Sequence, residues 1–129
     1  MPQPVLQALV LADHIYVDPD TQKKTIIGTF NTIWSNQFPN QLNKSTFAYV
    51  SLTEVQGKIP LQLRYVDLQD NKLLIKLDFE VESSDPLTSI ELIFAVPPFP
   101  MPQEGVFAFE VVYDDVSIGS LRVLAKKKA

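Results

Sequence analysis

The only histidine of the chain, His14, directly follows Asp13 within the apolar run near the N-terminus. A histidine beside a carboxylate could act as a general base that is oriented by its acidic partner. No G-x-S-x-G serine motif accompanies the pair, and the chain has no cysteine to act as a nucleophile. We therefore favour a structural role for both residues near a strand end. The sequence predicts no catalytic residues, no cofactor and no enzymatic activity.

Carboxylates also occur in pairs where the chain is expected to reverse direction. Oxygen-rich loops at one end of a sandwich could hold calcium. Aspartates at such positions usually accept hydrogen bonds from their own backbone, and no EF-hand loop is present. We favour the turn role and predict no metal site, with calcium binding by Asp18 and Asp20 as the alternative. The pairs are Asp18 and Asp20, Asp67 and Asp70, and Asp114 and Asp115.

Four apolar side chains are candidates for contact with a partner or a ligand. Trp34 and Phe38 flank a short polar stretch before Pro39, and Phe99 and Met101 alternate with prolines. Exposed aromatic residues commonly anchor protein interfaces. The alternative for Trp34 and Phe38, which we favour, is that they close one end of the hydrophobic core.

A segment rich in proline lies between two strongly apolar runs. Its prolines are Pro97, Pro98, Pro100 and Pro102. The segment contains a P-x-x-P pattern of the kind that other domains recognise in polyproline II conformation. Proline cannot donate to a strand ladder, so we favour a stiff connector that ends the preceding strand at about Val96. A groove ligand and a loop that contacts a partner are the alternatives.

Length and charge exclude several classes of function. A chain of 129 residues is long enough for one self-sufficient domain, which we place at residues 1–129. The net charge of −4 disfavours binding to nucleic acid or to an anionic membrane. Residues 126–129, which include the only basic run, are expected to form a disordered tail. The absence of cysteine favours the cytoplasm.

Alternation of apolar and polar residues predicts an all-β fold. The clearest case covers residues 73–81, where only Leu74 is out of phase, and it forms an expected hairpin with residues 61–65. Similar patterns make about eight strands, including residues 5–17, 25–34, 46–53 and 90–96. We expect a single antiparallel β-sandwich with an immunoglobulin-like or related Greek-key path. A closed barrel is the competing architecture.

Two stretches carry a resemblance to a known family. Residues 8–39, "ALVLADHIYVDPDTQKKTIIGTFNTIWSNQFP", and the later segment "PMPQEGVFAFEVVYDD" resemble the opening and the end of a family of short bacterial proteins of unknown function. The matching positions are Asp13, Gly28, Phe30, Phe38-Pro39, Gly105, Phe107, Phe109 and Glu110. The chain departs from the family pattern at Gln103-Glu104 and at Asp115. The resemblance implies an immunoglobulin-like sandwich and no established activity.

The function suggested by these observations is a non-enzymatic binding or assembly module. Its partner is expected to be a protein, including a second copy of the chain, because a complete sandwich without reactive groups leaves its loops and sheet edges for contacts. The alternative is a β domain that binds a small apolar ligand, with Trp34, Phe38, Phe99 and Met101 as the lining.

Overall fold

The computed structural model describes residues 3–128, and within that range the chain forms eleven strands and no helix. The strands are β1 (Val5–Val17), β2 (Lys24–Thr29), β3 (Thr32–Ser35), β4 (Asn40–Leu42), β5 (Thr46–Thr53), β6 (Gly57–Asp67), β7 (Lys72–Ser83), β8 (Ile90–Val96), β9 (Phe99–Met101), β10 (Gly105–Tyr113) and β11 (Val116–Lys127). The all-β class predicted from the alternation is confirmed.

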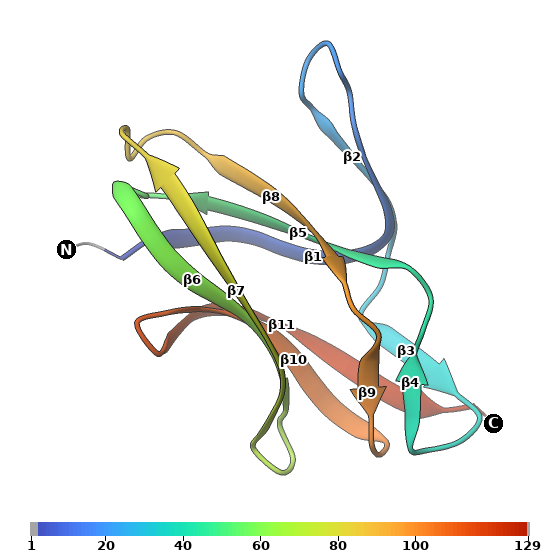
Figure 1. Ribbon diagram of the computed structural model, residues 1–129. Helices are drawn as coiled ribbons and strands as arrows, with labels where there is room; N and C mark the ends of the chain where they lie inside the picture. Colours follow the sequence, from blue (N-terminus) through green and yellow to red (C-terminus); the bar gives the residue numbers. More distant parts are fainter. Residues whose placement is uncertain (1–2, 129) are drawn as a thin grey trace.

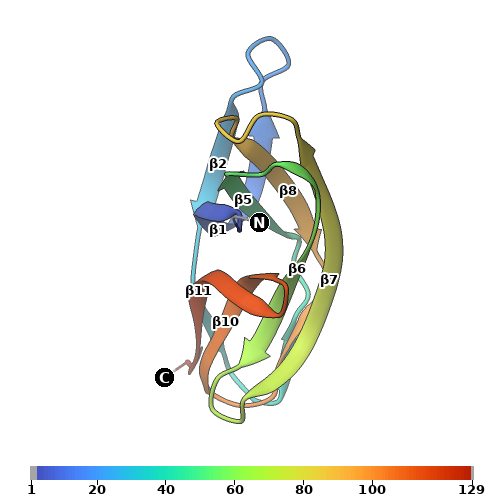
Figure 2. The ribbon, with the colours of Figure 1, turned by 90° about the vertical axis from the view of Figure 1, so that its left-hand side faces the viewer.

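Two main sheets pack face to face, and the β1–β2 hairpin extends beyond them (Figures 1 and 2). One sheet has the order β2-β1-β5-β8 and the other the order β3-β11-β10-β6-β7. Strand β5 pairs with β8 in the first sheet, whereas the next strand, β6, pairs with β10 in the second. This alternation between sheets is the Greek-key path of an immunoglobulin-like sandwich. Because the two sheets remain separate, the chain does not form a closed barrel.

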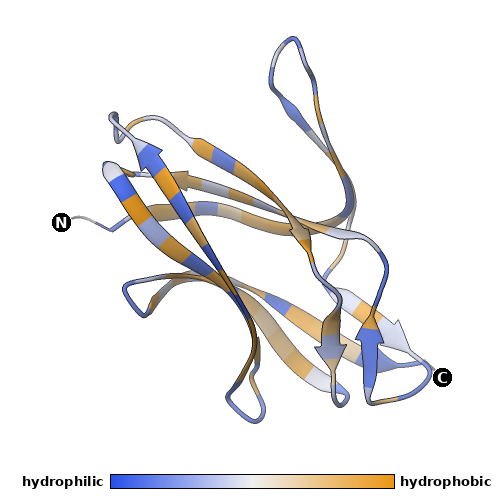
Figure 3. Cartoon of the chain, viewed as in Figure 1, coloured by the Kyte–Doolittle hydropathy of each residue, from blue (hydrophilic) through white to orange (hydrophobic). Residues whose placement is uncertain are grey.

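The hairpins expected from the sequence are present. Strand β6 pairs with β7, and β10 pairs with β11 across a two-residue turn in which Asp114 and Asp115 have φ angles of 52° and 63°. Two positive φ angles match the twist of the flanking strands. The out-of-phase Leu74 coincides with a register shift in the β6–β7 ladder, and it leaves Leu73 47% exposed. Figure 3 shows the polar and apolar alternation along both strands.

The expected strand at residues 25–34 is instead two strands in different sheets. The Phe30 backbone N–H donates to the Leu11 carbonyl of the first sheet, and the Asn31 carbonyl accepts from the Leu124 N–H of the second. The chain therefore crosses between the sheets at this point. Strand β3 then pairs in parallel with β11, whereas the sequence predicts an antiparallel sandwich.

The proline-rich segment leaves β8 after Val96, where the sequence predicts the strand end. The connector contains one further strand, β9, which pairs with β4 in a separate two-stranded sheet. The side chains of Phe99 and Met101 are 0% and 2% exposed, so this small sheet contributes directly to the core. The spacing of the prolines predicted that this segment connects two strands. It did not predict that the connector itself pairs with β4.

Four aromatic rings fill the core beside this small sheet. The ring centroid of Tyr65 lies 5.0 Å from that of Phe99, 5.6 Å from that of Phe107 and 4.8 Å from that of Phe109. The Tyr65 hydroxyl donates to the Pro100 carbonyl at 2.9 Å, which satisfies its only polar group. Such a cluster contributes both buried area and favourable ring geometry.

We expect Phe99→Ala to lower the free energy of unfolding by about 3–5 kcal/mol, since it removes a fully buried ring from this cluster. Urea denaturation measures the effect. Leu87→Ala is the control, because Leu87 is 81% exposed, and its change should stay within about 0.5 kcal/mol. Equal effects of the two substitutions would contradict the burial of β9.

One buried carboxylate organises the β6–β7 turn. Asp67 is 1% exposed, and its Oδ1 accepts from the backbone and side-chain nitrogens of Gln69, both at 2.9 Å, and from the Asp70 N–H at 3.3 Å. Burial raises the pKa of the Asp67 carboxyl, but these hydrogen bonds outweigh it and hold the pKa below its usual range.

The lowered pKa means that folding favours the ionised form of Asp67. Its contribution to stability is therefore present above the unfolded pKa of about 3.9 and is lost as pH falls through the folded value. We expect Asp67→Asn to cost about 1.5–3 kcal/mol near pH 7 and much less near pH 3. Urea titrations at both pH values measure this, and a pH-independent difference would show that the charge has no such role.

Candidate functional site

Trp34 lies on β3, the end strand of the five-stranded sheet, and its side chain points out of the sandwich. Its neighbours Ile33 and Ser35 are 6% and 5% exposed, whereas Trp34 is 56% exposed. This difference follows from the alternation of side chains along a strand. The predicted burial of Trp34 at the end of the core is therefore wrong, and the alternative, an exposed aromatic residue, is what the structure shows.

The chain end holds β3 in place. Lys126 pairs with Trp34 and Lys127 with Ser35 in the β3–β11 ladder, and the Lys128 N–H donates to the Ser35 carbonyl at 2.9 Å. The expected disordered tail at residues 126–129 is thus ordered through Lys128, and Ala129 lies outside the described residues. Strand β11 continues through Lys127 because β3 supplies hydrogen-bond partners for it. A local charge pattern does not predict these partners.

The loop after β3 is fixed by the hydroxyl of Ser35. This hydroxyl donates to the Gln37 carbonyl at 2.7 Å and accepts from the Asn40 Nδ2 at 2.6 Å. Phe38, within the loop, is partly buried and packs against the core. Phe38 therefore anchors the loop from inside, as the favoured interpretation predicts, while Trp34 stays outside.

A hollow lies on each side of the Trp34 side chain. The first has a volume of about 380 Å³ and the second about 520 Å³, and both are open to solvent. The first is lined by Phe30, Thr32, Ile33, Trp34, Leu42, Lys44 and Lys128. The second is lined by Trp34, Glu104, Gly105, Val106, Leu124, Ala125, Lys126 and Lys127.

Lysines surround this tryptophan, although the chain as a whole is acidic. Lys126 places its Nζ 5.7 Å from the centroid of the Trp34 ring, within the range of a cation–π contact. Lys126, Lys127 and Lys128 form no salt bridge within residues 3–128. Glu104 is the nearby carboxylate, and its Oε2 accepts from the Lys127 backbone N–H at 2.7 Å. We call Trp34, Lys44 and these three lysines the Trp34 surface.

The fourth lysine of the Trp34 surface is held by residues that carry the family resemblance. Lys44 Nζ lies 2.8 Å from Asp13 Oδ1 and 4.3 Å from the centroid of the Phe30 ring. Gly28, with φ +74°, lies opposite Asp13, and a Cβ there would come within 2.6 Å of the carboxylate. Glycine is therefore required both by the backbone conformation and by the space that Asp13 occupies. These positions fix one wall of the first hollow.

The four candidate contact residues do not share one cavity. Trp34 is on the surface, Phe38 is partly buried, and Phe99 and Met101 belong to the core. The last two cannot reach a partner while the domain is folded. The sequence singled out Trp34 but did not indicate Lys44 or the ordered lysines, and the only available signal was the basic run at the chain end.

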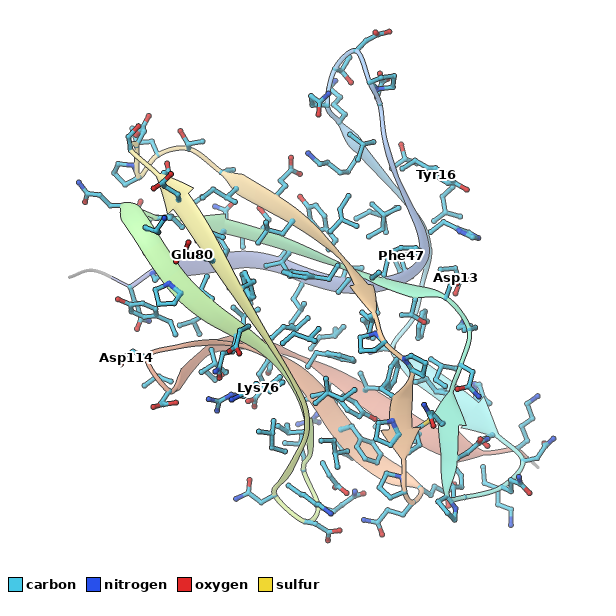
Figure 4. All side chains as sticks on the ribbon, in the orientation of Figure 1. Asp13, Tyr16, Phe47, Lys76, Glu80 and Asp114 are labelled. Carbon is cyan, nitrogen blue, oxygen red and sulfur yellow. The ribbon has the colours of Figure 1, made fainter. Side chains whose placement is uncertain are left out.

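His14 and Asp13 do not form a catalytic pair. His14 is exposed on the β1–β2 hairpin and stacks against Tyr16, with 6.0 Å between ring centroids, whereas Asp13 binds Lys44. Figure 4 shows Asp13 and Tyr16 at different heights on this hairpin. Neighbouring residues of a strand point to opposite faces, and this separates the side chain of His14 from that of Asp13.

Asp18 performs the turn role expected of it. Its Oδ1 accepts from the backbone N–H groups of Asp20 and Thr21, at 2.8 and 3.3 Å. Within residues 3–128, no three histidine, aspartate or glutamate side chains come together in a group that could hold a metal ion. In the same range, no helix is long and apolar enough to cross a membrane.

The chain is similar to the members of one protein family and to several solved structures. The model of a family described as "Family of unknown function (DUF6941)" matches residues 7–125. No curated protein matches the chain. The crystal structure of an immunoglobulin-like protein from Pseudomonas aeruginosa aligns with 13% sequence identity over 96% of this chain and 97% of that chain, with a TM-score of 0.47.

Trp34 is the only tryptophan of the chain, so its fluorescence reports on this surface alone. We expect iodide to quench it more strongly than caesium at equal ionic strength, because the surrounding lysines concentrate anions. Lys126→Gln together with Lys128→Gln should reduce the difference. Equal quenching by the two ions in the unmodified protein would contradict the basic character of the Trp34 surface.

Proposed function

Because the chain belongs to this family of unknown function, no activity comes with its membership, and we propose that it is a non-enzymatic protein-binding module that acts through the Trp34 surface. The single observation that carries this proposal is the exposed tryptophan on an ordered strand. Its location in the cytoplasm is part of the proposal and is supported by the absence of cysteine from the sequence.

A tryptophan in this position is suited to anchor a partner. Tryptophan is enriched among the residues that contribute most to protein interfaces, because it buries a large area at a small cost in side-chain entropy. Strand β3 is held by β11, so little further ordering of the backbone is needed on binding. The hollows on both sides of the ring provide room for side chains of the partner.

A small apolar ligand is the less favoured alternative. Such a ligand would need space between the sheets, where the rings of Tyr65, Phe99 and Phe109 already lie within 4.8–5.4 Å of one another. Inserting a ligand there would require the core to separate, which is costly in a close-packed interior. The open hollows beside Trp34 are better matched to side chains of a protein.

A second copy of the chain is the first partner to consider. The net charge of −4 supplies acidic surface that the lysines of the Trp34 surface could meet. Light scattering coupled to size-exclusion chromatography over a wide concentration range tests for self-association. A protein that remains monomeric throughout would direct the search to other partners.

We expect Trp34→Ala to lose partners that the unmodified protein captures from a lysate of its native host, with at least about a tenfold reduction in recovery. Val116→Ala is the matched control, since Val116 is 57% exposed on the β10–β11 hairpin. Quantitative mass spectrometry of the captured proteins provides the measurement. An identical set of partners for all three proteins would refute a role for the Trp34 surface.

A further inference from the structure

We propose that the partner binds as an extended, acidic segment that adds a strand to the free edge of β3, and this inference rests on the proposed function above. Such strand addition uses backbone hydrogen bonds for register and alternate side chains for specificity. Three features support it: the free backbone groups of β3, the shape of the first hollow and the charges of the Trp34 surface.

The backbone of β3 leaves one edge unpaired. The Asn31 carbonyl accepts from the Leu124 N–H, and the Ser35 carbonyl accepts from the Lys128 N–H. Because backbone groups alternate in direction along a strand, Thr32 and Trp34 direct their N–H and C=O groups away from β11. Strand β3 is the last strand of its sheet, and within residues 3–128 its only strand partner is β11. These two residues therefore present donors and acceptors to an incoming strand.

The first hollow runs along this free edge. It is lined by Thr32 and Trp34 of β3 and by Leu42 of β4, and apart from Lys128 it has no wall from the β11 side. Its apolar lining comes from Phe30, Ile33 and Leu42. Ile33 belongs to the core cluster, and Phe30 and Leu42 pack against that cluster. The volume of about 380 Å³ accommodates side chains that an added strand would direct toward the core.

The charges of the Trp34 surface specify an acidic segment. In an added strand, the side chains that do not enter the hollow lie on the same face as Trp34 and its ladder neighbour Lys126. Lys44 and Lys128 lie at the edge of the hollow itself. Acidic side chains would thus meet Lys126 and Lys128, which form no salt bridge within residues 3–128, and Lys44, which also binds Asp13, while the alternate apolar side chains fill the hollow. An alternating acidic and apolar sequence fits both requirements.

A peptide matches these features better than other polyanions. Nucleic acids draw their affinity from several phosphate contacts, whereas the Trp34 surface offers four lysines, one of which already binds Asp13. Phosphates of a nucleic acid or a lipid could pair with the lysines but not with the alternating N–H and C=O groups of Thr32 and Trp34. The free edge of β3 therefore distinguishes a strand from a polyanion of another class.

The probe is a capped octapeptide of alternating glutamate and valine. We expect it to shift the emission of Trp34 and to slow amide hydrogen exchange at Thr32 and Trp34 by at least about tenfold at saturation. The corresponding lysine–valine peptide should produce neither effect. Lys126→Glu combined with Lys128→Glu should weaken binding by at least about tenfold.

The control for charge is Lys72→Glu combined with Lys76→Glu. These two residues are exposed on β7, away from β3, and the substitutions change the net charge by the same amount (Figures 1 and 4). This control should bind the probe as tightly as the unmodified protein does. Equal weakening in both double variants would show that only overall charge matters and would overturn the proposal.

Methylation of the peptide backbone separates strand addition from contact by side chains alone. Two versions of the probe carry N-methyl groups on either the odd or the even residues, which removes the donors from one edge at a time. We expect one version to lose at least about tenfold in affinity and the other to bind normally. Equal binding by both would refute strand addition while leaving the proposed function intact.

Two further outcomes would also overturn this inference. One is tighter binding of a decamer of uridylate, or of vesicles containing phosphatidylserine, than of the acidic peptide. The other is failure of the acidic peptide to bind while captured partners still depend on Trp34. In the second case the Trp34 surface is a protein-binding site, but its partner is not an acidic strand.

Discussion

The packing of Tyr65 against three phenylalanine rings is the interaction on which the rest of the structure depends. The ring joins β6, β9 and β10, and its hydroxyl donates to the carbonyl of Pro100. Burial, and to a lesser extent the charge of Asp67, raises the pKa of the Tyr65 hydroxyl, which keeps the proton that this hydrogen bond requires. Strand β9 is thereby held over the core, and its partner β4 forms one side of the hollow beside Trp34.

The Trp34 surface is a consequence of this scaffold together with the change of sheet at residues 30 and 31. By leaving the first sheet at Phe30, the chain brings β3 next to β11 and exposes its other edge. Short end strands are one way in which proteins limit unwanted pairing. Here a four-residue end strand carries the only tryptophan of the chain, and four lysines line the two hollows beside it.

Much of the fold could be predicted from local patterns. The alternation in residues 73–81 gave the correct core face except at Leu73, and the irregular Leu74 marked the position of a register shift. The prolines placed the end of β8 at the correct residue. Of the four candidate contact residues, only Trp34 proved to be well exposed. Local patterns record how side chains alternate, but they do not record which strand lies alongside, so β4 and β9 were missed.

The sequence by itself determined the all-β class, most of the strands and their hairpins, because alternation and turn residues act within a few neighbouring positions. Only the tertiary structure decided that residues 25–34 divide between two sheets, that Lys126 and Lys127 are ordered, and that Trp34 is exposed. All three depend on the pairing of β3 with β11, which joins segments from opposite parts of the chain. Hydrogen bonds between such distant segments follow from the path of the whole chain, and for that reason no local pattern specifies them.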